Sequence, residues 1–329
     1  MDTLTHTLTG AVMSRAGLKR WSPYATPLLL LAANAPDIDM VTLFGGATNC
    51  LHYHRHIAHS LIAAPFLALL PVLVVRLFAR KPFGWKAAYG VSALGVLSHL
   101  LLDWTNSYGI RLLLPFSGVW VHLDIFDIVD VWIWVILLAA LLVPLLAALV
   151  SREIGARPGS GRAIAATALC FLALYGFGRY LLHNRASAIL ESRLYGGLAP
   201  LRVAAFPTGT SPFRWRGLVE TGPFYSIEDV NLLTGFDPAA GQLYYKPEPN
   251  PAEAAAADAA RRTNPFRVFL DFSKYPLWGF MPADRPDGSL RVEVTDLRFG
   301  EPPIPKFVAS AVVAPGGRVL QSEFRYRRR

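Results

Sequence analysis

The stretch from Val129 to Val150, VDVWIWVILLAALLVPLLAALV, decides the class of fold. A helix needs about 20 consecutive, mostly apolar residues to cross the hydrocarbon core of a bilayer, and Asp130 is the only charged residue here. Three more stretches have the same character: Ser60–Phe78, Ala87–Trp104 and Ala163–Leu182. We therefore expect a protein that several helices embed in a membrane.

Two weaker apolar segments precede these stretches, at residues 4–18 and 23–44. The second is interrupted by three polar residues and a proline, namely Asn34, Pro36, Asp37 and Asp39. Such a pair forms a helical hairpin that either crosses with support from neighbouring helices or dips into the bilayer and returns. Together the segments predict an all-α polytopic membrane domain of about six helical segments over residues 1–183.

The chain changes character from residue 184, where charge and proline return. The runs RVFLDF, from Arg267, and LRVEVT, from Leu290, alternate apolar and polar side chains, which predicts strands. The Ala-rich segment Pro251 to Arg262 predicts either a helix or a flexible insert. We therefore expect a smaller, β-rich α+β domain outside the membrane over residues 184–329.

The formal net charge is +9, from 32 Lys and Arg against 23 Asp and Glu. Basic residues gather in alternate connections between the apolar segments: Arg15, Lys19 and Arg20; Arg76, Arg80, Lys81 and Lys86; and Arg152, Arg157 and Arg162. This is the pattern of the positive-inside rule, so it indicates membrane topology and argues against nucleic-acid binding. The basic connections are expected in the cytoplasm. In a bacterium this predicts a multi-pass inner-membrane protein whose termini and C-terminal domain are extracytoplasmic.

Histidine and aspartate residues gather on the outer side of this topology. The groups are Asp2 and His6; Asp37 and Asp39; His52, His54, His56 and His59; His99 and Asp103; and His122, Asp124, Asp127 and Asp130. The spacing of four residues in the first and fourth groups puts both side chains on one helix face. Because the topology rests on Lys and Arg alone, this agreement is an independent observation.

Such a set of side chains is typical of a metal site. Ionisable groups at membrane depth are costly unless they pair or bind a ligand. Imidazole nitrogens and carboxylate oxygens suit a divalent metal, with zinc preferred and manganese or iron(II) as alternatives. The number of groups allows two ions, or one ion with further residues that orient its ligands.

Each group also has a purely structural interpretation. Asp2 is equally suited to cap the first helix, and Asp37, after Pro36, to form a turn. The histidine-rich loop is also consistent with a solvated loop. His99 and Asp103 also suit a hydrogen-bonded pair between helices. It is the convergence of the groups that favours a metal site.

Four motifs follow one another in the first half of the chain: Asp2-x-x-x-His6, Pro36-Asp37-x-Asp39, His54-Arg55-x-x-x-His59-Ser60 and His99-x-x-x-Asp103. They resemble the bacterial membrane-bound metal-dependent hydrolases, the YdjM-like proteins, over residues 1–183. That family often has Thr where this chain has Ala58, which loses a hydroxyl group and no ligand. The family is distantly similar to zinc-dependent phospholipase C and the single-strand-specific zinc nucleases. The resemblance implies a metal held by Asp37, His54 or His59, His99 and Asp103, with Asp2 and His6 close behind.

The function expected from these observations is metal-dependent hydrolysis at the outer face of the inner membrane, on a phosphoester or lipid-like substrate. Asp39 or Asp127 would act as general base, and Arg55 would pair with a phosphate unless it is a plain surface charge. Membrane lipids and a small-molecule or lipid substrate are the expected partners. Two other classes stay open: an ion- or proton-coupled transporter, and a non-catalytic scaffold with a structural metal.

Overall fold

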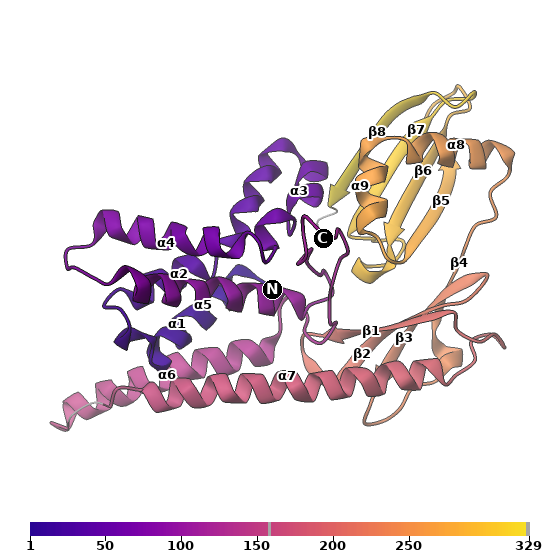
Figure 1. The fold of residues 1–329 in the computed structure, drawn as a ribbon. Coiled ribbons are helices and arrows are strands. Elements are labelled where there is room, and N and C mark those ends of the chain that lie inside the picture. The colour runs from indigo at the N-terminus through magenta and orange to yellow at the C-terminus, as the bar shows by residue number, and fades with distance from the viewer. Residues whose placement is uncertain (157–158, 327–329) are drawn as a thin grey trace.

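A bundle of helices forms the first half of the molecule and two small sheets form the second (Figure 1). The computed structural model describes residues 1–156 and 159–326, so Arg157, used above for the topology, lies outside the described residues. The elements of the first half are α1 (Thr3–Ala16), η1 (Leu18–Arg20), α2 (Ala25–Ala32), η2 (Pro36–Gly45), α3 (Ala47–Tyr53), η3 (Ile57–His59), α4 (Ala64–Phe78), α5 (Trp85–Trp104), α6 (Val131–Glu153) and α7 (Arg162–Glu191). The long helices pack side by side, whereas α3 projects toward the sheets (Figure 1).

Each sheet is an antiparallel meander of four strands in chain order. The first sheet holds β1 (Arg202–Thr208), β2 (Ser211–Glu220), β3 (Phe224–Asn231) and β4 (Gln242–Tyr245), and the second holds β5 (Pro276–Pro282), β6 (Leu290–Asp296), β7 (Phe307–Val313) and β8 (Val319–Tyr326). Short helical elements complete this half: η4 (Pro238–Ala240), α8 (Pro251–Arg261), α9 (Asn264–Phe272) and η5 (Leu297–Phe299). The first sheet packs on the end of α7, and α8 and α9 cover one face of the second (Figure 1).

The expectation of an all-α polytopic membrane domain of about six helical segments is wrong, because too few of the described helices have the length and hydropathy to cross a membrane. Among the described residues, only α6 and α7 are single helices long and apolar enough to cross a membrane. The number rises to four if two bent pairs each count as one span. One pair is α2 with η2, bent by 44°, and the other is the segment Ala47–His59 with α4, bent by 88°.

Helix length and composition explain this difference. α1 has 14 residues and α4 has 15, so each is about 21–23 Å long, short of a hydrocarbon core about 30 Å thick. α2 ends after 8 residues, just before Asn34 and Pro36. α5 has 20 residues, but Lys86, His99 and Asp103 help to make it less apolar than α6 and α7. The apolar runs that contain α1, α2 and α4 extend beyond these helices, so run length overestimates helix length.

The strand predicted at residues 267–272 is part of helix α9 instead. Pro265 stands in the first turn of α9, where its missing N–H leaves no helical hydrogen bond unmade. Phe266, Phe269 and Phe272 then share one helix face and are fully buried. The strand predicted from Leu290 is confirmed as β6, and the Ala-rich segment is helix α8.

The two halves of the chain share a hydrophobic core. Leu51 of α3, together with Tyr108 and Trp120 of the segment between α5 and α6, is buried against Phe272 and the second sheet. Helix α7 also runs without a break across residue 183 to Glu191. The division into two domains at residue 183 therefore stays a prediction.

Candidate metal centre

Close packing of α1, α2 and α5 brings the site together. A Cβ atom on Gly10 of α1 would lie 2.8 Å from the carbonyl oxygen of Leu29, and one on Gly95 of α5 would lie 2.7 Å from Cβ of Ala32. Both glycines therefore let their helices approach α2 more closely than a side chain would allow. Beyond the end of α2 the chain turns into η2, which places Asp37 beside the end of α5.

Four side chains converge at this point: Asp37 of η2, His59 of η3, and His99 and Asp103 of α5. The Nε2 atoms of His59 and His99 lie 3.1 Å apart, and each lies 3.4 Å from Oδ2 of Asp103. Oδ1 of Asp37 lies 3.5 Å from Nε2 of His59 and 3.7 Å from Nε2 of His99. The Asp37 side chain is 20% exposed, whereas the other three are fully buried.

Contacts to the outer ring nitrogens turn both imidazoles toward the centre. Nδ1 of His99 lies 2.7 Å from the carbonyl oxygen of Ala33, which can only accept a hydrogen bond. Nδ1 must therefore carry the proton, and Nε2 of a neutral His99 presents a lone pair. Nδ1 of His59 lies 3.0 Å from Oδ2 of Asp39, which favours the same tautomer. Two lone pairs 3.1 Å apart repel each other unless a proton or a metal ion lies between them.

Asp103 points one oxygen at the same centre and is held by the other. Its Oδ1 accepts a hydrogen bond from Nη2 of Arg55 at 3.0 Å and another from the α-amino group of Met1. Its Oδ2 has no hydrogen-bond donor among the residues that the structure describes. A buried carboxylate oxygen without a donor is costly, and a bound cation would remove that cost.

The spacing of these donor atoms suits a divalent metal ion. Ligands on tetrahedral zinc, with bonds of about 2.0–2.1 Å, lie about 3.3 Å apart. The five separations given above run from 3.1 to 3.7 Å, and all four donor atoms lie within 4.8 Å of one another. Two neutral imidazoles and two carboxylates also form a donor set that zinc, manganese and iron(II) accept. Asp37, His59, His99 and Asp103 therefore form a cluster that could hold a metal ion.

Asp39 and His54 stand beside the cluster. Oδ1 of Asp39 lies 2.8 Å from Nδ1 of His54, and its Oδ2 accepts the backbone N–H of Arg55 at 2.9 Å. Asp37, Asp39 and His54 form a second group whose donor atoms lie within 4.8 Å of one another. Because both oxygens of Asp39 are already engaged, this carboxylate is better placed to orient His54 and His59 than to bind an ion itself.

Arg55 is buried beneath the cluster, so its interpretation as a surface charge is wrong. Its side chain is 5% exposed and lies over the ring of Tyr108, 4.8 Å from the centroid. Nη1 donates to Oδ1 of Asn106 at 2.9 Å, while Nη2 donates to Asp103. Its backbone φ of 58° is rare outside glycine, and such strain is common at functional sites. The guanidinium positions Asp103 and is not turned outward to meet a phosphate.

The two residues of the motif Asp2-x-x-x-His6 have different roles. His6 stacks on His99, with ring centroids 3.8 Å apart, and its Nε2 lies 3.3 Å from Oδ1 of Asp103. Asp2 caps α1 instead, where it accepts the backbone N–H of Thr5 at 3.0 Å. The structure therefore brings His6 to the edge of the cluster and gives Asp2 the capping role.

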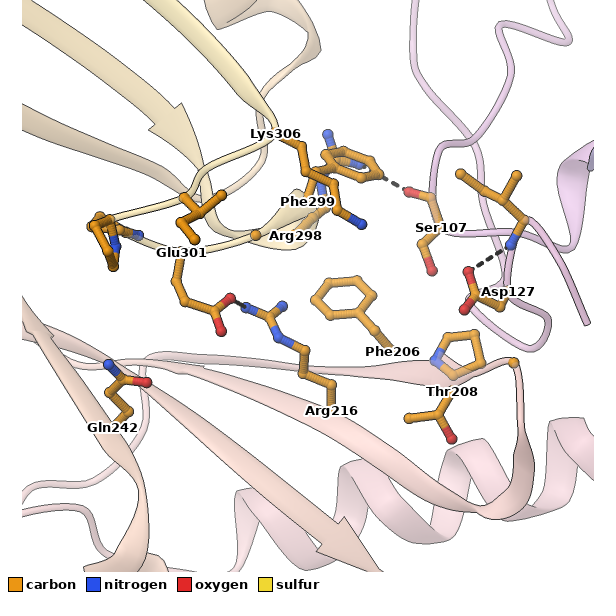
Figure 2. Close-up of a pocket in the computed structure, with 17 residues that line it drawn as sticks. Ser107, Asp127, Phe206, Thr208, Arg216, Gln242, Arg298, Phe299, Glu301 and Lys306 are labelled. Carbon is orange, nitrogen blue, oxygen red and sulfur yellow. Dashed lines mark hydrogen bonds and ion pairs between the residues drawn. The ribbon is translucent and has the colours of Figure 1, made fainter. Parts of the chain in front are cut away.

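Asp127 lies apart from the cluster. It stands before α6 and lines a cavity between the two sheets (Figure 2). Its Oδ1 accepts the backbone N–H of Ile128 at 2.7 Å, and burial raises the pKa of its carboxyl group. No hydrogen bond or ion pair among the described residues joins Asp127 to the four ligands.

Two residues that support the site were not singled out from the sequence. Ala33 contributes only a carbonyl oxygen, and every residue has one, so no sequence signal marks it. Asn106 bonds both Arg55 and Asp103. It is a polar residue three positions after Asp103 at the end of an apolar helix, and that position was a usable signal.

The comparisons with known proteins include the part of the chain that holds the cluster. Residues 1–186 match the family model described as YdjM inner membrane protein. The uncharacterized protein YfhP of Bacillus subtilis (strain 168) is 26% identical over 318 residues, which cover 91% of this chain and 87% of that protein. No solved structure matches the chain significantly. Every residue of the cluster lies within the matched part of the chain.

Proposed function

The chain belongs to the YdjM inner membrane protein family, and we propose that it is a metal-dependent hydrolase of that membrane. The observation that carries this proposal is the convergence of Nε2 of His59, Nε2 of His99 and Oδ2 of Asp103 within 3.4 Å of one another. Three electron-rich atoms so arranged call for a cation. The resemblance of the motifs to metal-dependent hydrolases supplies the reaction class.

Zinc is the ion that we assign, because the donor spacing suits a tetrahedral site. When bound, such an ion supplies Lewis acidity, which activates water and polarises a phosphoryl oxygen. The chain itself holds three ligands rigidly, since His59, His99 and Asp103 are fully buried. Asp37 is partly exposed and therefore marks the side from which a substrate enters.

His54 is the residue that we assign to proton transfer. Asp39 binds its Nδ1, so its Nε2 is left to accept or donate a proton at the mouth of the site. The His54 side chain is 16% exposed, whereas that of His59 is fully buried. Asp39, expected above as general base, orients this base instead.

The surface beside the cluster favours a lipid-like phosphoester as substrate. Element η2 exposes Ile38 by 59%, Val41 by 60% and Phe44 by 94%. Apolar side chains so exposed on a membrane protein are suited to contact with acyl chains. A phosphoester at the level of the lipid headgroups would then lie close to Asp37.

The distribution of charge supports a cluster that faces the outside of the cell. Arg15, Lys19 and Arg20 lie at the end of α1 opposite His6. Under the positive-inside rule this basic end is cytoplasmic. The start of α1, with the cluster and the sheets beyond it, is then extracytoplasmic.

Two other functions would use the same cluster. A transporter holds its ion near the middle of the membrane, whereas this cluster lies where α1 begins and α5 ends, which favours a site at the membrane surface. A structural metal site is usually closed by four protein ligands. This cluster also offers four donors, so catalysis requires the ion to expand to a fifth coordination position. The exposure of Asp37 and His54 leaves one side of the cluster open for it, which favours catalysis.

Metal analysis of the purified full-length protein tests the proposal. Wild-type protein is expected to carry about one equivalent of zinc, and His99→Ala and Asp37→Ala to lose it. His52→Ala, outside the cluster, is the control and should keep it. A panel of phosphoesters assayed on the same samples should be hydrolysed only by the metal-bearing proteins. Wild-type protein without metal would contradict the proposed metal site. Bound metal without hydrolysis would favour the non-catalytic scaffold with a structural metal.

A further inference from the structure

A cavity lies between the two sheets and the segment that leads into α6 (Figure 2). Its volume is about 910 Å³, at the upper end of the range in which proteins hold small molecules. Ser107 lines this cavity, while its neighbour Asn106 accepts a hydrogen bond from Arg55 of the metal centre. One layer of chain therefore separates the cavity from the metal centre.

Among the described residues, one cationic group of the cavity takes part in no hydrogen bond or ion pair. Arg216 donates to Oε2 of Glu301 at 2.8 Å, and Arg298 pairs with Asp296 at 2.8 Å. The ammonium group of Lys306 makes no hydrogen bond or ion pair within residues 1–156 and 159–326. The cavity thus offers a free positive charge, with the guanidinium of Arg216 on the wall below it (Figure 2).

The acidic residue on the opposite wall does not neutralise this charge by contact. Asp127 is bound by the backbone N–H groups of Ile128 and Gly209, which hold the loop before α6. The positive charge of Lys306 acts on the Asp127 carboxyl group through space and lowers its pKa against the effect of burial, but no ion pair joins the two side chains within the described residues. An anion that enters the cavity beside Lys306 therefore does not have to displace a carboxylate.

The walls of the cavity are aromatic and lead toward the membrane. Phe206 and Phe299 line its interior (Figure 2). From its rim an apolar strip, at least 36% exposed at each residue, runs into α6: Ile128, Val129, Val131 and Trp132. Because α6 is long and apolar enough to cross a membrane, this strip joins the cavity to the surface of the bilayer. Trp is typical of that interface.

We propose that this cavity binds an anionic phospholipid from the adjoining bilayer. Its phosphate lies at Lys306 and Arg216, and one acyl chain lies along Phe206 and Phe299. The positive charge of Lys306 favours an anionic ligand. The aromatic walls favour an amphiphile, because a free anion would leave Phe206 and Phe299 in contact with water. The lipid is a ligand distinct from the substrate of the metal centre, so this proposal does not depend on the hydrolase function.

Native mass spectrometry of the full-length protein in neutral detergent tests this proposal, with phosphatidylglycerol and phosphatidylcholine as the probes. Wild-type protein is expected to retain phosphatidylglycerol about tenfold better than phosphatidylcholine. Lys306→Glu should abolish that preference. Ile304→Asp, which changes a 66% exposed residue of the cavity wall, should weaken retention of phosphatidylglycerol. Arg318→Ala, in the turn between β7 and β8, is the control and should retain it fully.

Three results would overturn the proposal. One is equal retention of both lipids by wild-type protein. Another is an unchanged preference in Lys306→Glu protein. The third is displacement of phosphatidylglycerol by inorganic phosphate alone, since that identifies an anion site in which the acyl chain has no part. The metal content of each sample, measured in parallel, separates this result from the test of the hydrolase, because loss of lipid with full metal content concerns the cavity alone.

Discussion

At the scale of single residues, the proposed metal centre depends on groups outside its four donor side chains. The carbonyl oxygen of Ala33 sets the tautomer of His99 across 66 positions of the chain, and Asp39 does the same for His59. The ligands can be recognised by residue type, because imidazole and carboxylate are the groups that bind zinc. The support from Ala33 cannot, because a backbone carbonyl carries no residue identity.

His54→Ala tests the role assigned to His54. Loss of a positioned general acid–base lowers rates by 10²–10⁴, so we expect kcat on the best phosphoester to fall by about 100-fold or more. Zinc content should stay at the wild-type level, because His54 is not one of the four central ligands. His52→Ala is the matched control and should change neither quantity. Zinc lost together with activity would instead make His54 a ligand.

At the scale of elements, the contact of α5 with α2 decides whether the ligands meet. Gly95 stands one turn before His99 on the face that packs against Ala32. Gly90 lies on the same helix, but the nearest atom to its Cβ position is 3.9 Å away. A side chain at Gly95 would collide with the neighbouring helix α2, whereas one at Gly90 would make an ordinary van der Waals contact with Trp21.

The same substitution at these two glycines should therefore have opposite effects. Gly95→Ala is expected to push α5 away from α2, lower Tm and reduce bound zinc, although it changes no ligand. Gly90→Ala should raise Tm slightly, since alanine favours a helix interior over glycine by about 1 kcal/mol. Thermal unfolding and metal analysis of both proteins check this. A Gly95→Ala protein with wild-type Tm and zinc would show that the close approach is not needed.

Elements also show where a pattern misleads. The run RVFLDF was predicted to be a strand, yet it belongs to α9. The phenylalanines that begin before that run, at Phe266, Phe269 and Phe272, repeat every three residues and bury one helix face against the second sheet. A six-residue window fits both periods, and contact with the sheet decides between them.

At the scale of the whole molecule, the sheets are part of the structure that supports the helical half. Phe272 is 1% exposed and packs against Tyr108 and Trp120 of the segment after α5. That segment also carries Asn106, which holds Arg55. Loss of packing at Phe272 should therefore disturb the position of Asn106 and Arg55 beside the proposed metal centre.

Phe272→Ala should destabilise the protein by about 3–5 kcal/mol, the usual cost of removing a buried phenylalanine. The physical reason is the cavity left between the two halves. We expect a lower Tm and a lower zinc content in the full-length protein. Phe213→Ala, at a residue 37% exposed, is the control and should change both much less. An unchanged zinc content in Phe272→Ala protein with a lowered Tm would mean that the halves are not coupled.

Residue type and spacing were enough to indicate a membrane protein and to gather a wider set of His and Asp groups on one side of the predicted topology. The family resemblance narrowed that set to Asp37, His54 or His59, His99 and Asp103, and the structure places His59 in the cluster with the other three. Both signals are local, because hydropathy and ligand chemistry belong to the residues themselves. The number of helices that reach across a membrane, the burial of Arg55, the capping role of Asp2 and the separation of Asp127 from the cluster were decided only by the tertiary structure. Each depends on where helices end and which distant segments they meet, and those contacts have no counterpart in the local sequence.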